Sequence, residues 1–279
     1  MEILETLQTI LGKYFLAQKS GDTNEMVSVF QELVGARNYL AVSKGFSNYL
    51  DLQKNFFRIS ESHWQKYLSN RDAFASKFSP QLESSSNNPH FLSKLPSLKI
   101  SFPNGVFDHV SQTYPEITKL KDKIILSISD EGAHYKYSKD EDSYSIFIPH
   151  TNHNQQVSML IHELAHILSQ EKHQHQILGG YEDELEAHQI EFGLVRKFSN
   201  SFFQAVVGEY LICLVRTEFQ ISMFENHELD STPLYTSCFE KYVGKQNPEN
   251  ILDYLSDKKI INLPLTDLSV AVALVILLS

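Results

Sequence analysis

The spacing of apolar residues predicts helices over most of the first 80 positions. At the N-terminus they recur at the period of one helix face, at Ile3, Leu4, Leu7, Ile10, Leu11, Tyr14 and Phe15. Breaks are expected near Ser20-Gly21-Asp22 and near Gly45, because these residue types favour turns. The stretch 81–96, rich in serine and asparagine, is expected to be a loop.

Short strands are expected in the middle of the chain. The segments Lys123–Ser129 and Ser143–Ile148 alternate or run apolar with charged residues between them, which predicts a β-hairpin. Leu98–Phe102 is a further candidate for a short strand. Two more helices are expected over 157–168 and from about 182 to 198, separated by a polar stretch and Gly179-Gly180.

The first of these two helices carries the motif His162-Glu163-Leu164-Ala165-His166. At about 100° per residue the two histidines lie about 40° apart on one stripe, while the apolar residues occupy the opposite face. Their imidazoles can therefore reach one ion, and Glu163 points toward the side where a water on that ion would lie. The motif predicts one zinc ion per chain; the alternative is two ordinary surface histidines.

A catalytic zinc ion needs a third protein ligand, and the second helix offers several carboxylates. Glu184 lies in the middle of its apolar face together with Ala187, His188 and Glu191, where an unpaired carboxylate would be costly. Glu184 is therefore the predicted ligand, with Glu186, on the opposite, polar side, as the weaker choice. His188 and Glu191 are expected to orient the ligands, or to form an ordinary buried hydrogen-bond cluster.

The assembled pattern resembles the gluzincins, and within them the oligoendopeptidase F and thimet oligopeptidase family. That family has His-Glu-x-Gly-His followed by a glutamate, a small residue three positions later and an acid seven positions later. Looser similarities lie in Ala36-Arg37-Asn38 with Lys44–Tyr49, in Leu214–Glu225, and in Gly132-Ala133. The resemblance implies that Gly132 and Ala133, placed in a hairpin before the motif, border the substrate.

The chain also departs from the family pattern. Ala165 replaces the glycine before the second histidine, and Ser169 replaces a further histidine. Family members are about twice as long and carry tyrosine and histidine near the C-terminus, where they hold the transition-state oxyanion. The stretch 263–279 has neither residue, and Tyr235, Tyr242 and His227 are the nearest substitutes in sequence.

The amino-acid composition limits the binding partners and the cellular compartment that we expect for this protein. The formal net charge of −10 argues against nucleic acid and anionic membranes as partners. Two cysteines, Cys213 and Cys238, form no disulfide framework, which favours a reducing compartment such as the cytoplasm. The apolar run Leu268–Leu278 spans only 11 residues, whereas a membrane helix needs about 20, so a buried terminal element is expected.

These observations together predict a mostly α fold with a small β-hairpin or sheet, of the α+β class. An N-terminal helical region (1–116) is expected to precede a zincin-like catalytic region (117–279), within one compact unit. The expected function is a zinc metalloendopeptidase that hydrolyses short peptides or unfolded segments, with Glu163 as general base. Two alternatives stay open: a regulatory or processing zinc protease, and a catalytically weak zinc protein that binds peptides.

Overall fold

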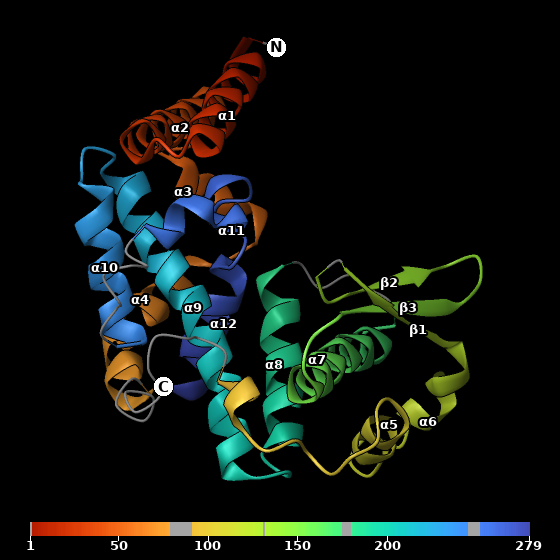
Figure 1. Ribbon diagram of the computed structural model, residues 1–279. Helices are drawn as coiled ribbons and strands as arrows, with labels where there is room; N and C mark the ends of the chain where they lie inside the picture. Colours follow the sequence, from red (N-terminus) through yellow and green to blue (C-terminus); the bar gives the residue numbers. More distant parts are fainter. Residues whose placement is uncertain (1, 79–90, 131, 175–179, 245–251) are drawn as a thin grey trace. The chain divides into compact units, whose positions relative to one another are not determined.

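The computed structural model describes residues 2–78, 91–130, 132–174, 180–244 and 252–279 (Figure 1). The chain forms two compact units: Met1–Asn87 with Tyr210–Ser279, and Asn88–Glu209. This division differs from the two consecutive regions, 1–116 and 117–279, expected from the sequence. The reason is that helices from the end of the chain pack against helices from its beginning, as the contact between the helices Glu61–Phe78 and Leu268–Leu278 shows.

The first unit is helical throughout its described part. It contains α1 (Glu2–Ser20), α2 (Thr23–Ser43), α3 (Tyr49–Phe56), α4 (Glu61–Phe78), the later part of α9 (Asn200–Glu225), α10 (Ser231–Tyr242), η6 (Asp253–Ser256), α11 (Lys258–Ile261) and α12 (Leu268–Leu278). The predicted breaks are confirmed: Gly21 and Gly45 have φ of +73° and +88°, and the Asp22 side chain accepts a hydrogen bond from Glu25 N at the start of α2.

Apolar burial holds this helical unit together. Phe30, Phe219 and Tyr254 form mutual ring contacts with centroids 5.2–5.9 Å apart. Helix α12 is almost wholly buried and packs on α4, so the predicted buried terminal element is confirmed as a helix. Among the described helices, none combines the length and apolarity that a membrane crossing requires.

The second unit holds the sheet and the two helices that follow it. Its elements are η3 (Leu92–Lys94), α5 (Asn104–Ser111), α6 (Ile117–Leu120), η4 (Lys121–Lys123), β1 (Ile124–Ser129), β2 (His134–Ser138), β3 (Ser143–Pro149), α7 (His153–Lys172), α8 (Tyr181–Val195) and the beginning of α9. The strand order is β1-β3-β2. The predicted fold class, mostly α with a small sheet, is therefore confirmed.

The predicted hairpin between 123–129 and 143–148 is wrong. β1 and β3 pair in parallel, with Ile124 opposite Tyr144, and the true hairpin joins β2 to β3 in antiparallel register. The segment between them holds a strand of its own, β2, whose tyrosines at 135 and 137 alternate with polar residues. That period-2 pattern was the available signal; the many polar residues concealed it.

The expected strand at 98–102 is also absent. Leu98 N donates to the Asn154 side-chain oxygen at 2.9 Å, and the Asn154 amide donates to the carbonyl oxygens of Leu92, Leu95 and Pro96. A buried side chain thus satisfies backbone groups that a strand partner would otherwise satisfy. Most of the expected loop at 81–96 lies outside the described residues, and its end contains η3.

Helix α7 is the central element of this unit (Figure 1). Asn152 caps it, its side chain accepting from Gln155 N, so the helix begins four residues before the predicted start. Its apolar face is buried as predicted, with the following residues fully shielded: Val157, Leu160, Ile161, Leu164, Ala165 and Ile167. Each such large side chain contributes about 1.5–3 kcal/mol on burial. This packing fixes the rotation of α7, and hence the direction of its histidines.

Candidate metal centre

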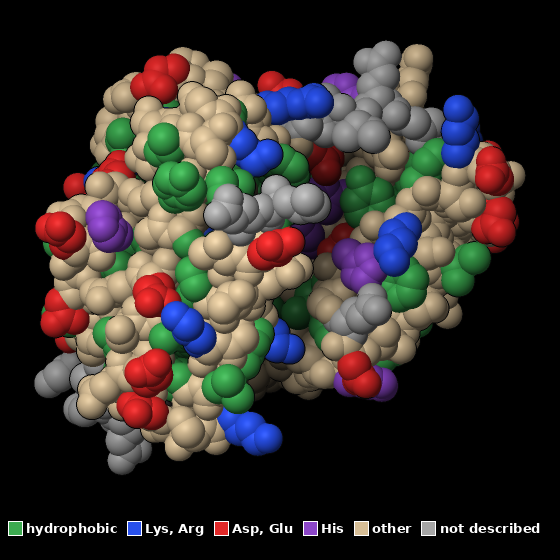
Figure 2. Space-filling view, turned by 90° about the horizontal axis from the view of Figure 1, so that it is seen from above, with side chains coloured by type: hydrophobic (Ala, Val, Ile, Leu, Met, Phe, Trp, Pro, Cys, Tyr) green, Lys and Arg blue, Asp and Glu red, His purple; other side chains and the backbone are tan. Residues whose placement is uncertain are grey.

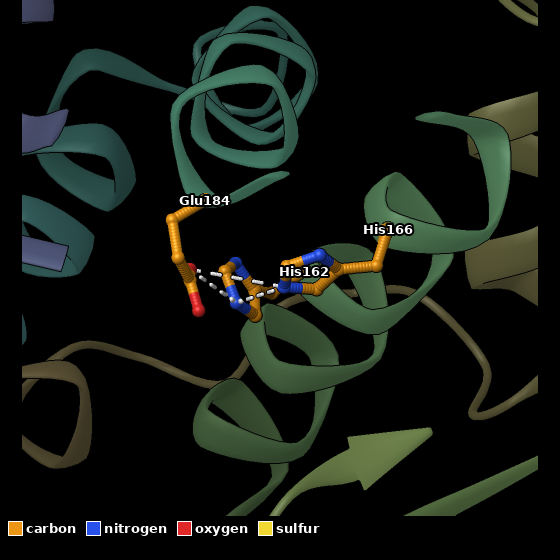
Figure 3. A group of neighbouring side chains, drawn as sticks. All are labelled: His162, His166 and Glu184. Carbon is orange, nitrogen blue, oxygen red and sulfur yellow. Dashed lines mark hydrogen bonds and ion pairs between the residues drawn. The ribbon is translucent and has the colours of Figure 1, made fainter. Parts of the chain in front are cut away.

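The three predicted metal ligands lie together in the structure. His162 and His166 project from α7 toward Glu184 on α8 (Figure 3). The Nε2 atoms of the two histidines are 3.1 Å apart. Each lies 3.8 Å from Oε2 of Glu184. Helices α7 and α8 therefore place two nitrogens and one carboxylate oxygen around one point.

This geometry fits a zinc ion. A triangle with sides of 3.1, 3.8 and 3.8 Å has one point about 2.1 Å from every corner, and zinc binds imidazole nitrogen and carboxylate oxygen at about 2.0–2.2 Å. Glu184 Oε2 is buried and accepts no hydrogen bond from any described residue. An ionised oxygen in that position is costly unless a cation neutralises it.

Helix phase explains why Glu184 faces α7. Gly180, at φ +45°, precedes the helix, and Glu184, Ala187, His188 and Glu191 follow at spacings of three and four residues. Ala187, His188 and Glu191 are fully buried. The sequence therefore predicted the correct face of α8. Ala187 leaves only a methyl group beside the ligand cluster.

The Glu191 carboxylate contacts both His162 and His188 through their Nδ1 atoms. Its Oε2 lies 3.0 Å from Nδ1 of His162 and 2.9 Å from Nδ1 of His188. Burial alone would raise the pKa of Glu191, but the neighbouring His162 and the hydrogen bonds of both imidazoles lower it to about 2. An ionised Glu191 accepts from Nδ1–H of His162, which leaves the Nε2 lone pair of His162 directed at the ligand cluster.

His166 has a corresponding carboxylate that the sequence analysis missed. Asp183 Oδ2 lies 3.1 Å from Nδ1 of His166. Asp183 directly precedes Glu184 in the first turn of α8, about 100° around the helix, so α8 presents one carboxylate to each side of the same imidazole. The position of Asp183, one residue before Glu184 on the helix, is the feature of the sequence that could have predicted this contact. Both predicted histidine ligands therefore have an acid next to Nδ1.

Glu186 lies outside the ligand cluster. Its carboxylate accepts from Ser169 Oγ at 2.8 Å, contacts His173 Nε2 at 2.7 Å and forms an ion pair with Lys172. These hydrogen bonds lower the pKa of Glu186 against the opposing effect of partial burial. Its place on the polar side of α8 suggested that Glu186 is solvated. Instead, it forms hydrogen bonds and an ion pair with residues at the end of α7. The geometry favours Glu184 as the third ligand.

Glu163 is only 4% exposed, next to the ligand histidines in sequence. Burial raises the pKa of Glu163, and the charge of Glu184 adds to this, while the positive charges of His162 and His166 oppose it. The net direction is upward, toward neutral pH. A carboxylate with a raised pKa is a stronger base, as general base catalysis near neutral pH requires.

The strand β2 brings one further group to the cluster. The Tyr135 ring stacks on the His166 ring, with centroids 5.5 Å apart and planes at 23°. Gly132 and Ala133, the residues expected at the substrate edge, directly precede β2 and lie outside the hairpin turn. The resemblance placed them in a hairpin because β2 was not recognised as a strand.

The residues considered as oxyanion donors, Tyr235, Tyr242 and His227, lie in the helical unit. Tyr235 and Tyr242 are buried there, and Tyr235 packs against Phe219 and Tyr254. His227 lies exposed between α9 and α10.

The orienting role of Glu191 can be tested by Glu191→Gln. The amide keeps the size of the side chain but removes the charge opposite His162 and His188, so zinc affinity is expected to fall about 10–100-fold. Competition with a chromophoric chelator measures this. Glu182→Gln, on the exposed side of α8, is the matched control. Equal affinities in the two variants would remove the role from Glu191.

Comparisons with known proteins identify the fold. No family model matches the sequence, and no curated protein matches it. Several solved structures share its fold, among them the three that follow. PZ peptidase A superposes with a TM-score of 0.66 at 12% identity, over 95% of this chain and 56% of its own. An oligoendopeptidase F superposes with a TM-score of 0.61 at 14% identity, over 89% of this chain and 54% of its own. An M32 carboxypeptidase from Deinococcus radiodurans superposes with a TM-score of 0.65 at 10% identity, over 97% of this chain and 65% of its own.

The chain thus shares the fold of these peptidase structures, as the sequence resemblance predicted. It spans between about half and two thirds of the length of these structures. At 10–14% identity the likeness concerns the fold, so the chemistry has to be argued from the residues of this chain.

Proposed function

We propose that this protein is a zinc-dependent peptidase that hydrolyses peptide bonds. The observation that carries the proposal is the arrangement of His162, His166 and Glu184, whose three ligand atoms lie at the separations that one zinc ion requires. Glu191 and Asp183 hold the imidazoles in place. His188 supports Glu191 from within α8.

Zinc bound here supplies Lewis acidity and lowers the pKa of a bound water. The residues of the chain provide the rest of the reaction. Glu163 takes a proton from the attacking water and later gives it to the nitrogen of the leaving amine. The new bond joins the water oxygen to the carbonyl carbon, and the carbon–nitrogen bond breaks.

The substrate we propose is a short peptide or an unfolded segment, extended along β2. β2 is an edge strand, because it pairs only with β3 in the described sheet, so its outer backbone groups can pair with an added strand. Gly132 and Ala133, just before β2, lack large side chains that would obstruct such a peptide.

We propose that this protein does not bind nucleic acid. On the face shown in Figure 2, the described Lys and Arg side chains are interspersed with Asp and Glu and do not gather into one basic patch. Cys213 and Cys238 are both free and buried. Free thiols support a reducing compartment, and we propose the cytoplasm.

The test is mass spectrometry of a diverse peptide mixture incubated with zinc-loaded protein. We expect cleavage at internal bonds, which defines an endopeptidase. Release of single C-terminal residues would instead indicate a carboxypeptidase, the activity in the name of the Deinococcus radiodurans structure. No cleavage by a protein that holds one zinc ion would contradict a general peptidase and favour a protease for one partner protein or a peptide-binding protein.

A further inference from the structure

Tyr135 is directed toward the candidate metal centre by the alternation of β2. It pairs in register with Ile146, which is fully buried on the side of β3 that packs on α7. The next residue, Lys136, is exposed on the other side of the strand. The Tyr135 ring therefore meets His166 because of its register position.

The hydroxyl of Tyr135 lies within electrostatic reach of the reacting groups. Burial raises the pKa of Tyr135, and the charges of Asp183, Glu163 and Glu184 raise it further. Asp183 lies next to His166, Glu163 is the proposed general base, and Glu184 is the predicted third ligand. The Tyr135 phenol is thus close enough to these three acids for their charges to act on it.

This hydroxyl is available for a ligand. It has no hydrogen-bond partner among the described residues and is not among the buried atoms that lack one. The other tyrosine hydroxyls of this sheet are engaged: Tyr137 donates to Asp142 at 3.1 Å, and Tyr144 donates to Glu171 at 2.7 Å. A half-buried polar group that has no partner among the described residues, beside the candidate metal centre, is placed to bind substrate.

Amide hydrolysis is accelerated by a hydrogen-bond donor such as this hydroxyl. Attack of water on the carbonyl carbon moves negative charge onto the carbonyl oxygen, and a fixed donor stabilises that charge more than it stabilises the neutral substrate. A phenol is protonated at neutral pH and can donate one hydrogen bond.

We propose that the Tyr135 hydroxyl donates a hydrogen bond to the oxyanion formed during peptide hydrolysis, an inference that rests on the proposed peptidase function. Tyr135 keeps its proton throughout. The proton of the attacking water passes through Glu163 to the leaving nitrogen, so the reaction balances without any change at the phenol. The strand β2 thereby supplies an oxyanion donor to the site.

The experiment compares Tyr135→Phe with Tyr137→Phe. Phenylalanine at 135 keeps the ring that stacks on His166 and removes only the hydroxyl. We expect kcat to fall about 10²–10³-fold with KM little changed, while Tyr137→Phe, on the same side of the same strand, stays near wild type. Both variants are expected to retain one zinc ion per chain.

A second readout does not depend on turnover. A phosphinic peptide has a tetrahedral anionic centre that resembles the oxyanion, so Tyr135→Phe should bind it about 10²–10³-fold more weakly by calorimetry. Binding of the unreacted peptide, measured in the Glu163→Gln background, should change little.

The outcomes separate this inference from the proposed function. Cleavage by the wild type, together with full activity and full phosphinic peptide affinity in Tyr135→Phe, would overturn the donor role and leave the peptidase intact. Loss of zinc from Tyr135→Phe would also overturn it, because the tyrosine would then only support His166. A zinc-loaded wild type that cleaves no peptide in the mixture would contradict the proposed general peptidase.

Discussion

Glu163→Gln is expected to retain zinc and to lose peptide hydrolysis. Glutamine has the size of glutamate but cannot accept the proton of water, and general base catalysis contributes typically about 10²–10⁴-fold in rate. We therefore expect kcat to fall by that factor with KM nearly unchanged, since the substituted group acts in the transition state. Zinc content by plasma mass spectrometry and initial rates on a cleaved peptide measure both effects.

A control on the same helix distinguishes this chemistry from a loss of charge. Glu171, two turns further along α7, accepts a hydrogen bond from Tyr144. Glu171→Gln removes a carboxylate of the same size but is expected to keep kcat within about twofold, because a glutamine oxygen can still accept that bond. Equal activity in Glu163→Gln and wild type would refute the assignment of Glu163.

Glu184→Ala is expected to weaken zinc binding far more than Glu186→Ala. In the proposed site Glu184 contributes one of three ligand atoms, so its removal should lower zinc affinity by more than about 100-fold, the upper range for groups that only orient ligands. Glu186 binds Ser169, His173 and Lys172 instead, and its removal should leave zinc affinity within about threefold. Chelator competition measures both.

The two variants form a matched pair. Both remove a glutamate from the first half of α8, two positions apart, so changes in helix propensity and net charge are the same. Glu186→Ala should instead lower the melting temperature, because it removes the carboxylate that joins α8 to the end of α7. The reverse ranking of zinc affinities would transfer the ligand role to Glu186.

The structure also bears on the alternative of a weak, non-catalytic zinc protein. That alternative arose because residues 263–279 contain neither tyrosine nor histidine. Tyr135 stacks on His166 from β2, and under the proposal above its hydroxyl would act as the oxyanion donor. The phosphinic peptide comparison therefore also tests this alternative.

The helical parts of the site could be predicted from the sequence. A helix repeats every 3.6 residues, so spacing alone places His162 and His166 on one stripe, and Glu184, His188 and Glu191 on another. The apolar residues of α7 and α8 then fix which side faces the core. This is why the motif and its partner helix could be identified without coordinates.

Contacts between strands and between side chains of different elements could not be predicted in this way. The parallel pairing of β1 with β3 depends on β2 taking the antiparallel position, and no local pattern specifies which strands pair. Likewise, Asp183 beside His166 and Glu186 beside Ser169 both depend on how α8 crosses α7.

Local periodicity therefore determined the helices, their inward faces and the residues predicted as ligands in this protein. Only the tertiary structure decided which acid serves which histidine, and that Tyr135 stacks on His166. The physical reason is that the period of a helix is set by bonds within one segment. Distances between segments are set by the packing of side chains far apart in the chain.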